Sequence, residues 1–237
     1  MTVQLRGVPT VLLPGTGSDD DYLRRAFGEA LVRAGAHLIT PAPQPRALID
    51  GYLAAVAAVD DGAGPDGAIA VGGVSLGAAV AVNWALAHPG RTVAVLAALP
   101  AWTGRPEQAP AALSARFAAG QLRESGLDAA VAAMRTGSPR WLADELTRSW
   151  TAQWPGLPDA LEAAAGYVGP STEQLRALTV PMGVAAAVGD AVHPVAVAEH
   201  WARTAPHAAL CTVTLDEMGV RPAALGDACV QALQQAR

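Results

Sequence analysis

Short apolar runs alternate with longer amphipathic or Ala-rich stretches along most of the chain. Apolar runs of about four to eight residues are typical of buried strands, and the stretches between them are long enough for helices. We predict strands at residues 10–13, 36–40, 68–74, 92–99, 182–188 and 209–215. We predict helices at residues 19–34, 47–59, 76–88, 171–178 and 195–204, and from 222 to the C-terminus. This alternation indicates an α/β fold with a doubly wound, mainly parallel sheet covered by helices on both faces.

Capping and turn residues predict where the early elements begin and end. Ser18 is the expected N-cap of the first helix, with Asp21 three residues later completing an arrangement like a capping box. The Pro-rich stretch 41–45 is the expected exit loop of the second strand. Asp60-Asp61-Gly62 and the Gly-Pro-Asp-Gly sequence at 64–67 predict a turn-rich break before the third strand.

The alternation stops between residues 100 and 169. Four helix-like pieces occur there, at 109–120, 122–134, 139–150 and 158–166, and no strand-like run separates them. A loop of this length without structure would be unusual in a compact domain. We therefore predict an α/β core of residues 1–99 and 170–237 with a helical cap inserted at 100–169. Its tryptophans either line an apolar pocket, hold the insertion together, or do both; they are Trp102, Trp141, Trp150 and Trp154.

Composition narrows the class of protein. The chain has 237 residues, 51% of them apolar and 16% charged, which is enough for a substantial core. The net charge is -5 and the sixteen basic residues are all arginine and scattered, so we expect no nucleic-acid partner. We expect a cytoplasmic protein without membrane contact, because the chain has neither a signal-peptide core near its start nor an apolar run long enough for a membrane span.

Metal and cofactor signatures are missing from the sequence. Cys211 and Cys229 lie in no CxxC or metal-ligand spacing, so we expect neither a disulfide nor a zinc site. No Rossmann GxGxxG motif and no P-loop occur, so we expect no cofactor. The acidic run Asp19-Asp20-Asp21 is interpreted as favourable charge at a helix N-terminus rather than as a metal site. The partner we expect is a small-molecule substrate, and the oligomeric state stays open.

The motif that carries chemistry is Gly73-Val74-Ser75-Leu76-Gly77, between a predicted strand and a predicted helix. A GxSxG motif in this context is typical of a nucleophile elbow, where small residues permit a tight turn that holds the serine at the carboxyl edge of the sheet. Backbone N–H groups at the start of the helix can then stabilise an oxyanion. The alternative is a serine that merely caps a helix.

With this elbow the chain resembles an α/β-hydrolase, over nearly its whole length from Leu12 to the last helix. The stretch 11–17, Val-Leu-Leu-Pro-Gly-Thr-Gly, resembles the family's oxyanion loop, which implies oxyanion donors at the N–H groups of Thr16 and Leu76. Asp190, in the stretch 188–194, matches the family's acid loop and would stabilise an imidazolium. The resemblance also implies a helical cap, and implies that the first two strands of the family are missing.

The resemblance fails at the catalytic histidine. Val220 stands where the family has a histidine after the last strand, and no histidine follows His207. We take His193 as the candidate general base, with Asp190, Asp216 or Glu217 as its orienting carboxylate. The alternative for His193 is a helix-start residue packed under the cap. Ordinary structural roles are expected for the remaining histidines, which are His37, His88, His200 and His207.

Three functions are compatible with these residues. The first is a serine hydrolase, an esterase or thioesterase that acts on a small, largely apolar acyl substrate through an acyl-enzyme on Ser75. The second is a non-hydrolytic lyase or cyclase of specialised-metabolite biosynthesis, which would use the same pocket without a complete triad. The third is a non-enzymatic binding protein, which the elbow disfavours because such a protein has no need of a strained serine.

Overall fold

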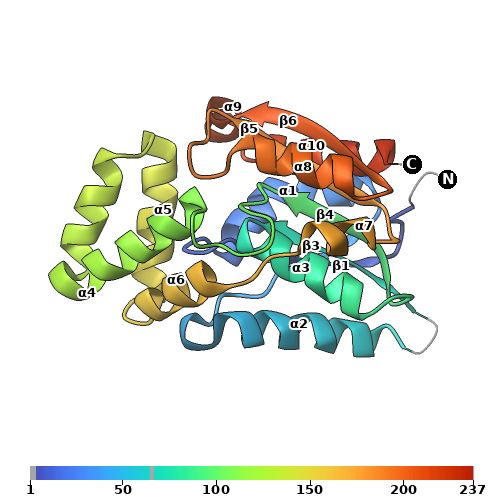
Figure 1. The fold of residues 1–237 in the computed structure, drawn as a ribbon, viewed down its shortest axis with the longest axis horizontal. Helices are drawn as coiled ribbons and strands as arrows, with labels where there is room; N and C mark the ends of the chain where they lie inside the picture. The colour runs from blue at the N-terminus through green and yellow to red at the C-terminus, as the bar shows by residue number, and fades with distance from the viewer. Residues whose placement is uncertain (1–3, 65–66, 237) are drawn as a thin grey trace.

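The described part of the chain contains one sheet of six parallel strands. The computed structural model describes residues 4–64 and 67–236, and in this part of the chain the strand order is β2-β1-β3-β4-β5-β6 (Figure 1). The strands are β1 (Pro9–Leu13), β2 (His37–Ile39), β3 (Ile69–Val74), β4 (Thr92–Ala98), β5 (Met182–Val188) and β6 (Ala208–Thr214). All six agree with the predicted strands to within about one residue at most ends, and the predicted fold class is confirmed.

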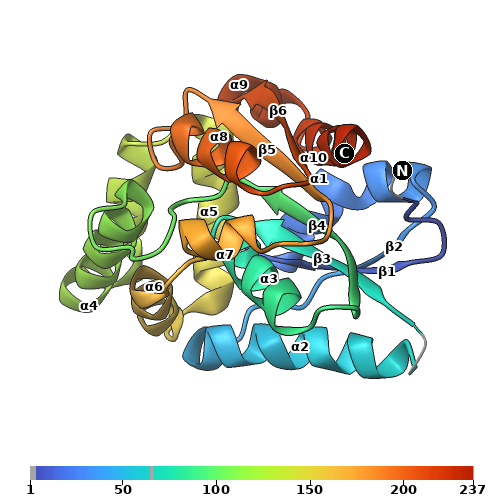
Figure 2. The same cartoon turned by 45° about the vertical axis from the view of Figure 1, so that its right-hand side comes forward.

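Helices cover both faces of the sheet. One face carries α1 (Asp20–Arg33) and α10 (Ala223–Gln235); the other carries α2 (Leu48–Gly62), α3 (Leu76–Ala87) and α8 (Val195–Thr204) (Figures 1 and 2). Shorter helical segments lie in the connections between these elements: η1 (Pro45–Ala47), α7 (Thr172–Arg176) and α9 (Leu215–Val220). This is the doubly wound arrangement expected of a parallel sheet, and its inner strands β1, β3, β4 and β5 are buried almost throughout.

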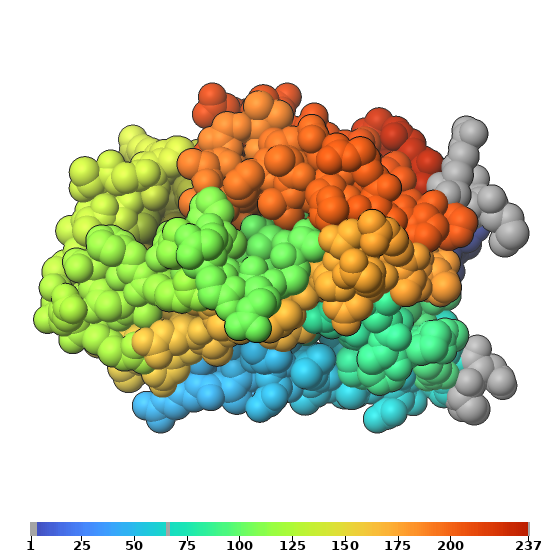
Figure 3. Space-filling view, in the orientation of Figure 1, coloured from blue at the N-terminus to red at the C-terminus, as the bar shows by residue number. Residues whose placement is uncertain are grey.

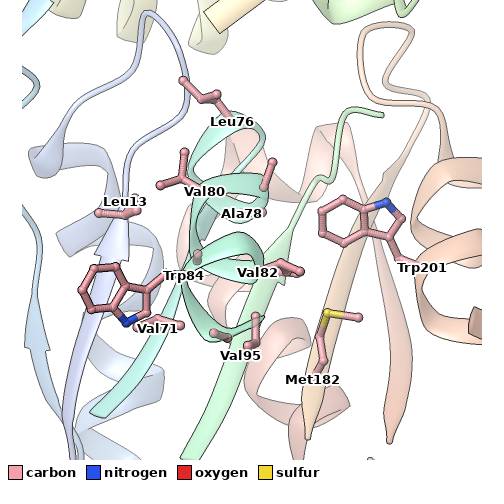
Figure 4. Close-up of a cluster of buried hydrophobic side chains, with 14 of the residues drawn as sticks. Leu13, Val71, Leu76, Ala78, Val80, Val82, Trp84, Val95, Met182 and Trp201 are labelled. Carbon is pink, nitrogen blue, oxygen red and sulfur yellow. The ribbon is translucent and has the colours of Figure 1, made fainter. Parts of the chain in front are cut away.

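The core beneath α3 explains why the start of this helix is fixed in place. Figure 4 shows its side chains Leu76, Val80 and Val82 among side chains of the neighbouring strands, such as Val71 and Val95. Each of these five residues is fully buried. Burial of a side chain of this size contributes about 1.5–3 kcal/mol, so the N-terminus of α3 has little freedom to move against the sheet.

Three helices form an insertion between β4 and α7, at the end of the molecule away from the termini (Figures 1 and 3). They are α4 (Pro110–Thr136), α5 (Arg140–Gln153) and α6 (Leu157–Gly166). A separate apolar cluster holds them together, with buried members that include Trp102, Leu122, Trp150 and Leu157. The insertion therefore has a small core of its own in addition to its contacts with the sheet.

Several predicted boundaries are wrong. Asp19, not Ser18, is the N-cap of α1, and its carboxylate accepts from the Tyr22 N–H at 3.0 Å. Both residue types cap helices well, and the ion pair of Asp19 with the insertion favours the later start. Residues 60–62 belong to α2 rather than to a turn. Asp60 binds Arg91 there, and the glycine with a positive φ is Gly64 rather than Gly62. Of the predicted turn that follows, residues 65 and 66 lie outside the described part.

The predicted break between two helices near residue 121 lies a few residues too early. α4 consists of two helical stretches that meet at a kink, and the kink falls at Gly126, with φ 78° and ψ 177°. Glycine adopts this conformation without the penalty that a side chain would bring. The sequence also does not predict the helix α9, because it occupies the stretch expected to be the loop after the last strand.

Candidate active site

Ser75 occupies a strained turn between β3 and α3. Its φ of 56° and ψ of -113° lie where residues with side chains are rare, at a cost of about 1–3 kcal/mol. The flanking glycines are required by close approach: a Cβ at Gly73 would lie 2.3 Å from the Leu13 carbonyl oxygen, and one at Gly77 would lie 2.0 Å from it. Ser75 therefore lies in a tight turn between β3 and α3 that requires glycine at positions 73 and 77.

Ser75, His193 and Asp190 form a continuous hydrogen-bonded chain. The Oγ of Ser75 lies 2.9 Å from Nε2 of His193, and Nδ1 of His193 lies 2.7 Å from Oδ2 of Asp190. The other carboxylate oxygen of Asp190 accepts from the N–H groups of Val192 at 2.8 Å and of His193 at 3.1 Å. Asp190 and His193 share the loop between β5 and α8, so this one loop positions both side chains against the elbow.

Electrostatics favour the charged form of Asp190. Burial alone would raise the pKa of Asp190, but the hydrogen bond and charge of His193 and the two backbone N–H donors outweigh it, and the pKa lies below its ordinary value. A charged Asp190 can only accept, so Nδ1 of His193 carries the ring proton. Nε2 is then left with a lone pair that faces the hydroxyl of Ser75, which is the arrangement of a general base.

The alternative carboxylates lie elsewhere. Asp216 and Glu217 are exposed on α9, and Glu217 forms a capping box with Thr214 at the start of that helix. Val220, at the position of the family's histidine, ends α9 with 88% of its surface exposed. Of the three carboxylates left open by the sequence, only Asp190 is hydrogen-bonded to His193 in the described residues.

Two other histidines have structural partners. His88 stacks on Trp84 with ring centroids 3.8 Å apart and bonds its carbonyl oxygen, at the C-terminal end of α3. His200 bonds the Thr172 hydroxyl at 3.1 Å, which joins α8 to α7. These contacts agree with the structural roles expected for them.

The candidate oxyanion donors flank the serine. Leu13 pairs with Gly73 across β1 and β3, which brings the loop after β1 beside the elbow. A Cβ at Gly15 would lie only 3.5 Å from the Cβ of Ser75, and Thr16 follows it along the wall of the same cavity. Within the described ranges, the N–H groups of Thr16 and of Leu76 have no protein acceptor. Both donors are therefore free to bind a ligand.

A cavity of about 410 Å³ lies between the elbow and the inserted helices. Ser75 and His193 form its floor together with the loops of the sheet, and α4, α5 and α6 supply most of its remaining wall. The wall is mainly apolar and includes Trp102, Trp141, Trp150, Met134 and Leu146. Trp154, the fourth tryptophan of the insertion, does not line it and is 39% exposed.

The charged side chains of the cavity wall are all paired. Arg148 binds Asp19 and Glu145, Glu145 also binds Arg25, and Asp190 binds His193. A charged group on a ligand would have to break one of these pairs or stay unpaired among mainly apolar side chains. The cavity therefore favours an uncharged ligand.

The acidic run at the start of α1 has partners that explain it. Asp19 caps the helix and binds Arg148, Asp20 binds Arg24, and Asp21 binds Arg25. No group of side chains that could hold a metal ion occurs in residues 4–64 and 67–236. Cys211 and Cys229 are free thiols.

Sequence reasoning missed the residues that join α5 to the core. Arg148 reaches Asp19 across 129 positions of sequence, and Gln153 reaches the carbonyl of Ser18 across 135. Tyr22, buried in the same wall, carries no sequence signal of its own either. The amphipathic pattern of α5 indicates a buried face, but nothing in it indicates which core segment that face meets.

Comparison with solved structures assigns the fold. The chain has the α/β-hydrolase fold, which its structural neighbours share. They include the putative non-heme bromoperoxidase BpoC from Mycobacterium tuberculosis H37Rv, with a TM-score of 0.70, 20% identity, and coverage of 98% of this chain and 93% of that one. MenH from S. aureus gives a TM-score of 0.73 at 16% identity, over 97% of this chain and 93% of that one.

A third structural neighbour has a different named activity from the first two. The enol-lactonase from Burkholderia xenovorans LB400 gives a TM-score of 0.64 at 17% identity, over 89% of this chain and 84% of that one.

Comparison of the sequence with protein-family models and with curated proteins finds no match. Among the helices that the structure describes, none combines the length and the apolar character needed to span a membrane.

Proposed function

We propose that this protein is a serine hydrolase that cleaves an ester or thioester of a small, largely apolar acyl group. The observation that carries the proposal is the chain from Ser75 Oγ through His193 to Asp190, with contacts of 2.9 and 2.7 Å. Both distances lie within the hydrogen-bonding range needed for proton transfer from nucleophile to base. The histidine absent at Val220 is replaced, in this proposal, by one from the acid loop itself.

The reaction has two stages. Ser75 Oγ attacks the acyl carbonyl carbon while its proton passes to Nε2 of His193, and the negative charge on the carbonyl oxygen is held by the N–H groups of Thr16 and Leu76. Collapse of this intermediate breaks the bond to the leaving group, which takes the proton from His193. Water then attacks the acyl carbon and gives a proton to His193, the bond from the acyl carbon to Ser75 Oγ breaks, Oγ takes the proton from His193, and the carboxylic acid leaves. Asp190 stabilises the imidazolium in both stages.

The cavity supports the choice of substrate. Its volume of about 410 Å³ is near the lower end of the range for small-molecule sites, about 300–1,000 Å³. Its mainly apolar wall and fully paired charges favour an acyl group without charge. We place the cap role of residues 100–169 in the same proposal, since α4, α5 and α6 enclose the acyl group above the serine.

The test is hydrolysis of p-nitrophenyl acetate and butyrate by the wild type and by Ser75→Ala and His193→Ala variants. We expect turnover by the wild type and loss of at least about a thousandfold in kcat for both variants. His200→Ala is the matched control, because that histidine serves only the contact between α7 and α8, and it should retain full activity.

A fluorophosphonate probe separates the outcomes. Labelling of Ser75 without ester turnover would indicate that the serine is activated for a different reaction, such as that of a lyase or cyclase. A wild type that neither reacts with the probe nor hydrolyses any ester would refute the proposal.

A further inference from the structure

The helix α5 of the insertion contacts three successive residues of the loop that follows β1. Trp150 packs against Gly17, Gln153 binds Ser18, and Arg148 binds Asp19. These residues directly follow Thr16, the candidate oxyanion donor. The insertion therefore holds a backbone segment of the reaction centre, in addition to roofing the cavity.

The contact with Asp19 is a two-pronged ion pair. Nη1 and Nη2 of Arg148 lie 2.5 and 2.9 Å from the two carboxylate oxygens, and Asp19 is 7% exposed. The same carboxylate caps α1 through the N–H of Tyr22. A fork of this kind fixes direction as well as distance, so it orients the end of the loop relative to α5.

The contact with Ser18 runs through a buried amide. Nε2 of Gln153 donates to the Ser18 carbonyl oxygen at 3.0 Å and to the Ser149 hydroxyl at 2.8 Å. Gln153 is 7% exposed and Ser149 is 1% exposed, so water cannot readily replace either bond. Within the loop itself, the Ser18 N–H closes a turn onto the Gly15 carbonyl at 3.0 Å. The amide of Gln153 thus holds the turn that contains Thr16.

The contact with Gly17 leaves no space for a side chain. Gly17 has a φ of 73°, and a Cβ there would lie 2.8 Å from Nε1 of Trp150. The indole ring, buried to all but 6% of its surface, lies directly against the loop backbone. Movement of the loop toward α5 is blocked by this ring, and movement away is opposed by the bonds of Gln153 and Arg148.

We propose that Arg148, Gln153 and Trp150 are positioning residues that hold the N–H of Thr16 where it stabilises the oxyanion. This inference rests on the proposed function, since it assigns a role in the same reaction. A donor has to be held to within about 0.5 Å of its productive position. Loss of one oxyanion donor lowers kcat by about 10²- to 10³-fold, so displacement of the donor should cost part of that factor.

The experiment compares Gln153→Leu and Arg148→Met with the wild type on p-nitrophenyl butyrate. We expect kcat to fall about ten- to a hundredfold while KM changes by less than about threefold, because the apolar wall that binds the acyl group is retained. Affinity for a trifluoromethyl ketone, whose adduct places an oxyanion in the same site, should fall by the same factor as kcat/KM. Arg148→Lys should recover part of the loss, and Arg140→Met is the control, since Arg140 on the same helix is exposed.

Two further measurements keep the result decisive. Thermal unfolding of each variant shows what fraction is folded at the assay temperature. If Gln153→Leu or Arg148→Met does not fold, Trp150→Phe, which retains an aromatic ring, takes its place in the comparison. The rate at which fluorophosphonate labels Ser75 reports the same oxyanion site without ester turnover, so it tests the positioning role even if hydrolysis is the wrong reaction.

The outcomes distinguish the two proposals. Folded variants with wild-type kcat, ketone affinity and labelling rate overturn the positioning role alone and leave the hydrolase intact. A fall in kcat that is matched by a rise in KM, with ketone affinity unchanged, also overturns it. A wild type without hydrolysis and without labelling overturns both.

Discussion

Replacement of Asp190 by asparagine tests the proposed role of this residue as the acid of a catalytic triad. The Oδ1 atom of Asp190 accepts two backbone N–H bonds, from Val192 and His193, so the amide oxygen of an asparagine will take that place. The amide nitrogen then faces Nδ1 of His193, where Oδ2 lay at 2.7 Å, and donates to it. The ring proton is forced to Nε2, which can no longer accept from Ser75. The geometry is preserved and the protonation is reversed.

The magnitude follows from this reversal. A triad histidine held in the wrong tautomer loses about 10⁴ in kcat. At 1.36 kcal/mol for each factor of ten, the loss corresponds to about 5.4 kcal/mol of transition-state stabilisation. KM should change little, because Asp190 lies behind the histidine and the acyl wall is unaltered. The assay is steady-state hydrolysis of p-nitrophenyl butyrate, with circular dichroism to show that the variant is folded.

The matched controls are the two carboxylates that the sequence left open. Asp216→Asn and Glu217→Gln change exposed groups on α9, and both should keep wild-type kcat. Glu217→Gln weakens a capping box and should lower stability by no more than about 1 kcal/mol. An Asp190→Asn enzyme within tenfold of the wild type, or a large loss in either control, would refute the assignment of Asp190 as the orienting carboxylate.

Three further predictions concern the turn at Ser75, the N-cap Asp19 and the cavity. Gly77→Ala places a Cβ 2.0 Å from the Leu13 carbonyl oxygen and should destabilise the fold by more than about 4 kcal/mol. Gly28→Ala, in open space on α1, should instead stabilise the fold by about 0.5–1 kcal/mol. Thermal unfolding measures both effects, and equal shifts in melting temperature would contradict the reasoning. Burial would raise the pKa of Asp19, but the bonds from Arg148 and the Tyr22 N–H outweigh it and lower the pKa, so the resulting stability is present above the ordinary aspartate pKa and is lost as the pH falls through the lowered value. The melting temperature should therefore fall below about pH 4, and Asp19→Asn should show a flatter fall; an unchanged slope would speak against the pair. Ala130 lines the cavity, so Ala130→Leu should fill part of it and lower kcat/KM for an octanoate ester about tenfold relative to an acetate ester. An equal loss with both esters would show that the acyl group does not reach α4.

Local patterns in the sequence predict most of the sheet and identify the candidate nucleophile. The ends of β5 and α8 agree with the prediction because Pro181 and Pro194 precede them and a glycine follows the strand. The Ser75 elbow is predictable because its whole geometry is encoded within five residues. The pair of Asp190 and His193 is visible as a spacing, but which carboxylate orients the histidine depends on the path of one loop.

Contacts between distant segments are not encoded in local patterns. Ser75 and His193 are 118 positions apart, and the sequence offers His193 as the base only through the family resemblance, with a structural role as the alternative; the alignment of parallel strands brings their loops to one edge of the sheet. The bond between Gln153 and Ser18 depends on the angle at which α5 returns to the core, which is set by the packing of the insertion as a whole. The predicted N-cap of α1 is one residue too early for the same reason, since the partner of Asp19 lies on that distant helix.

The loop that carries Asp190 and His193 has a consequence for how the site responds to thermal motion. It extends from β5, which is hydrogen-bonded to β4 on one side and to β6 on the other, whereas β6 is the last strand and has one neighbour. Outermost strands open first in local unfolding, so amide exchange should be faster along β6 and α9 than along β5. A histidine in a loop after β6 would move with this edge strand, and its distance to Asp190 would vary whenever the edge strand opened. Here a single short loop carries both Asp190 and His193 and fixes the distance between them. The amides of the edge strand β6 can therefore exchange with solvent while the hydrogen bonds from Asp190 through His193 to Ser75 stay in place.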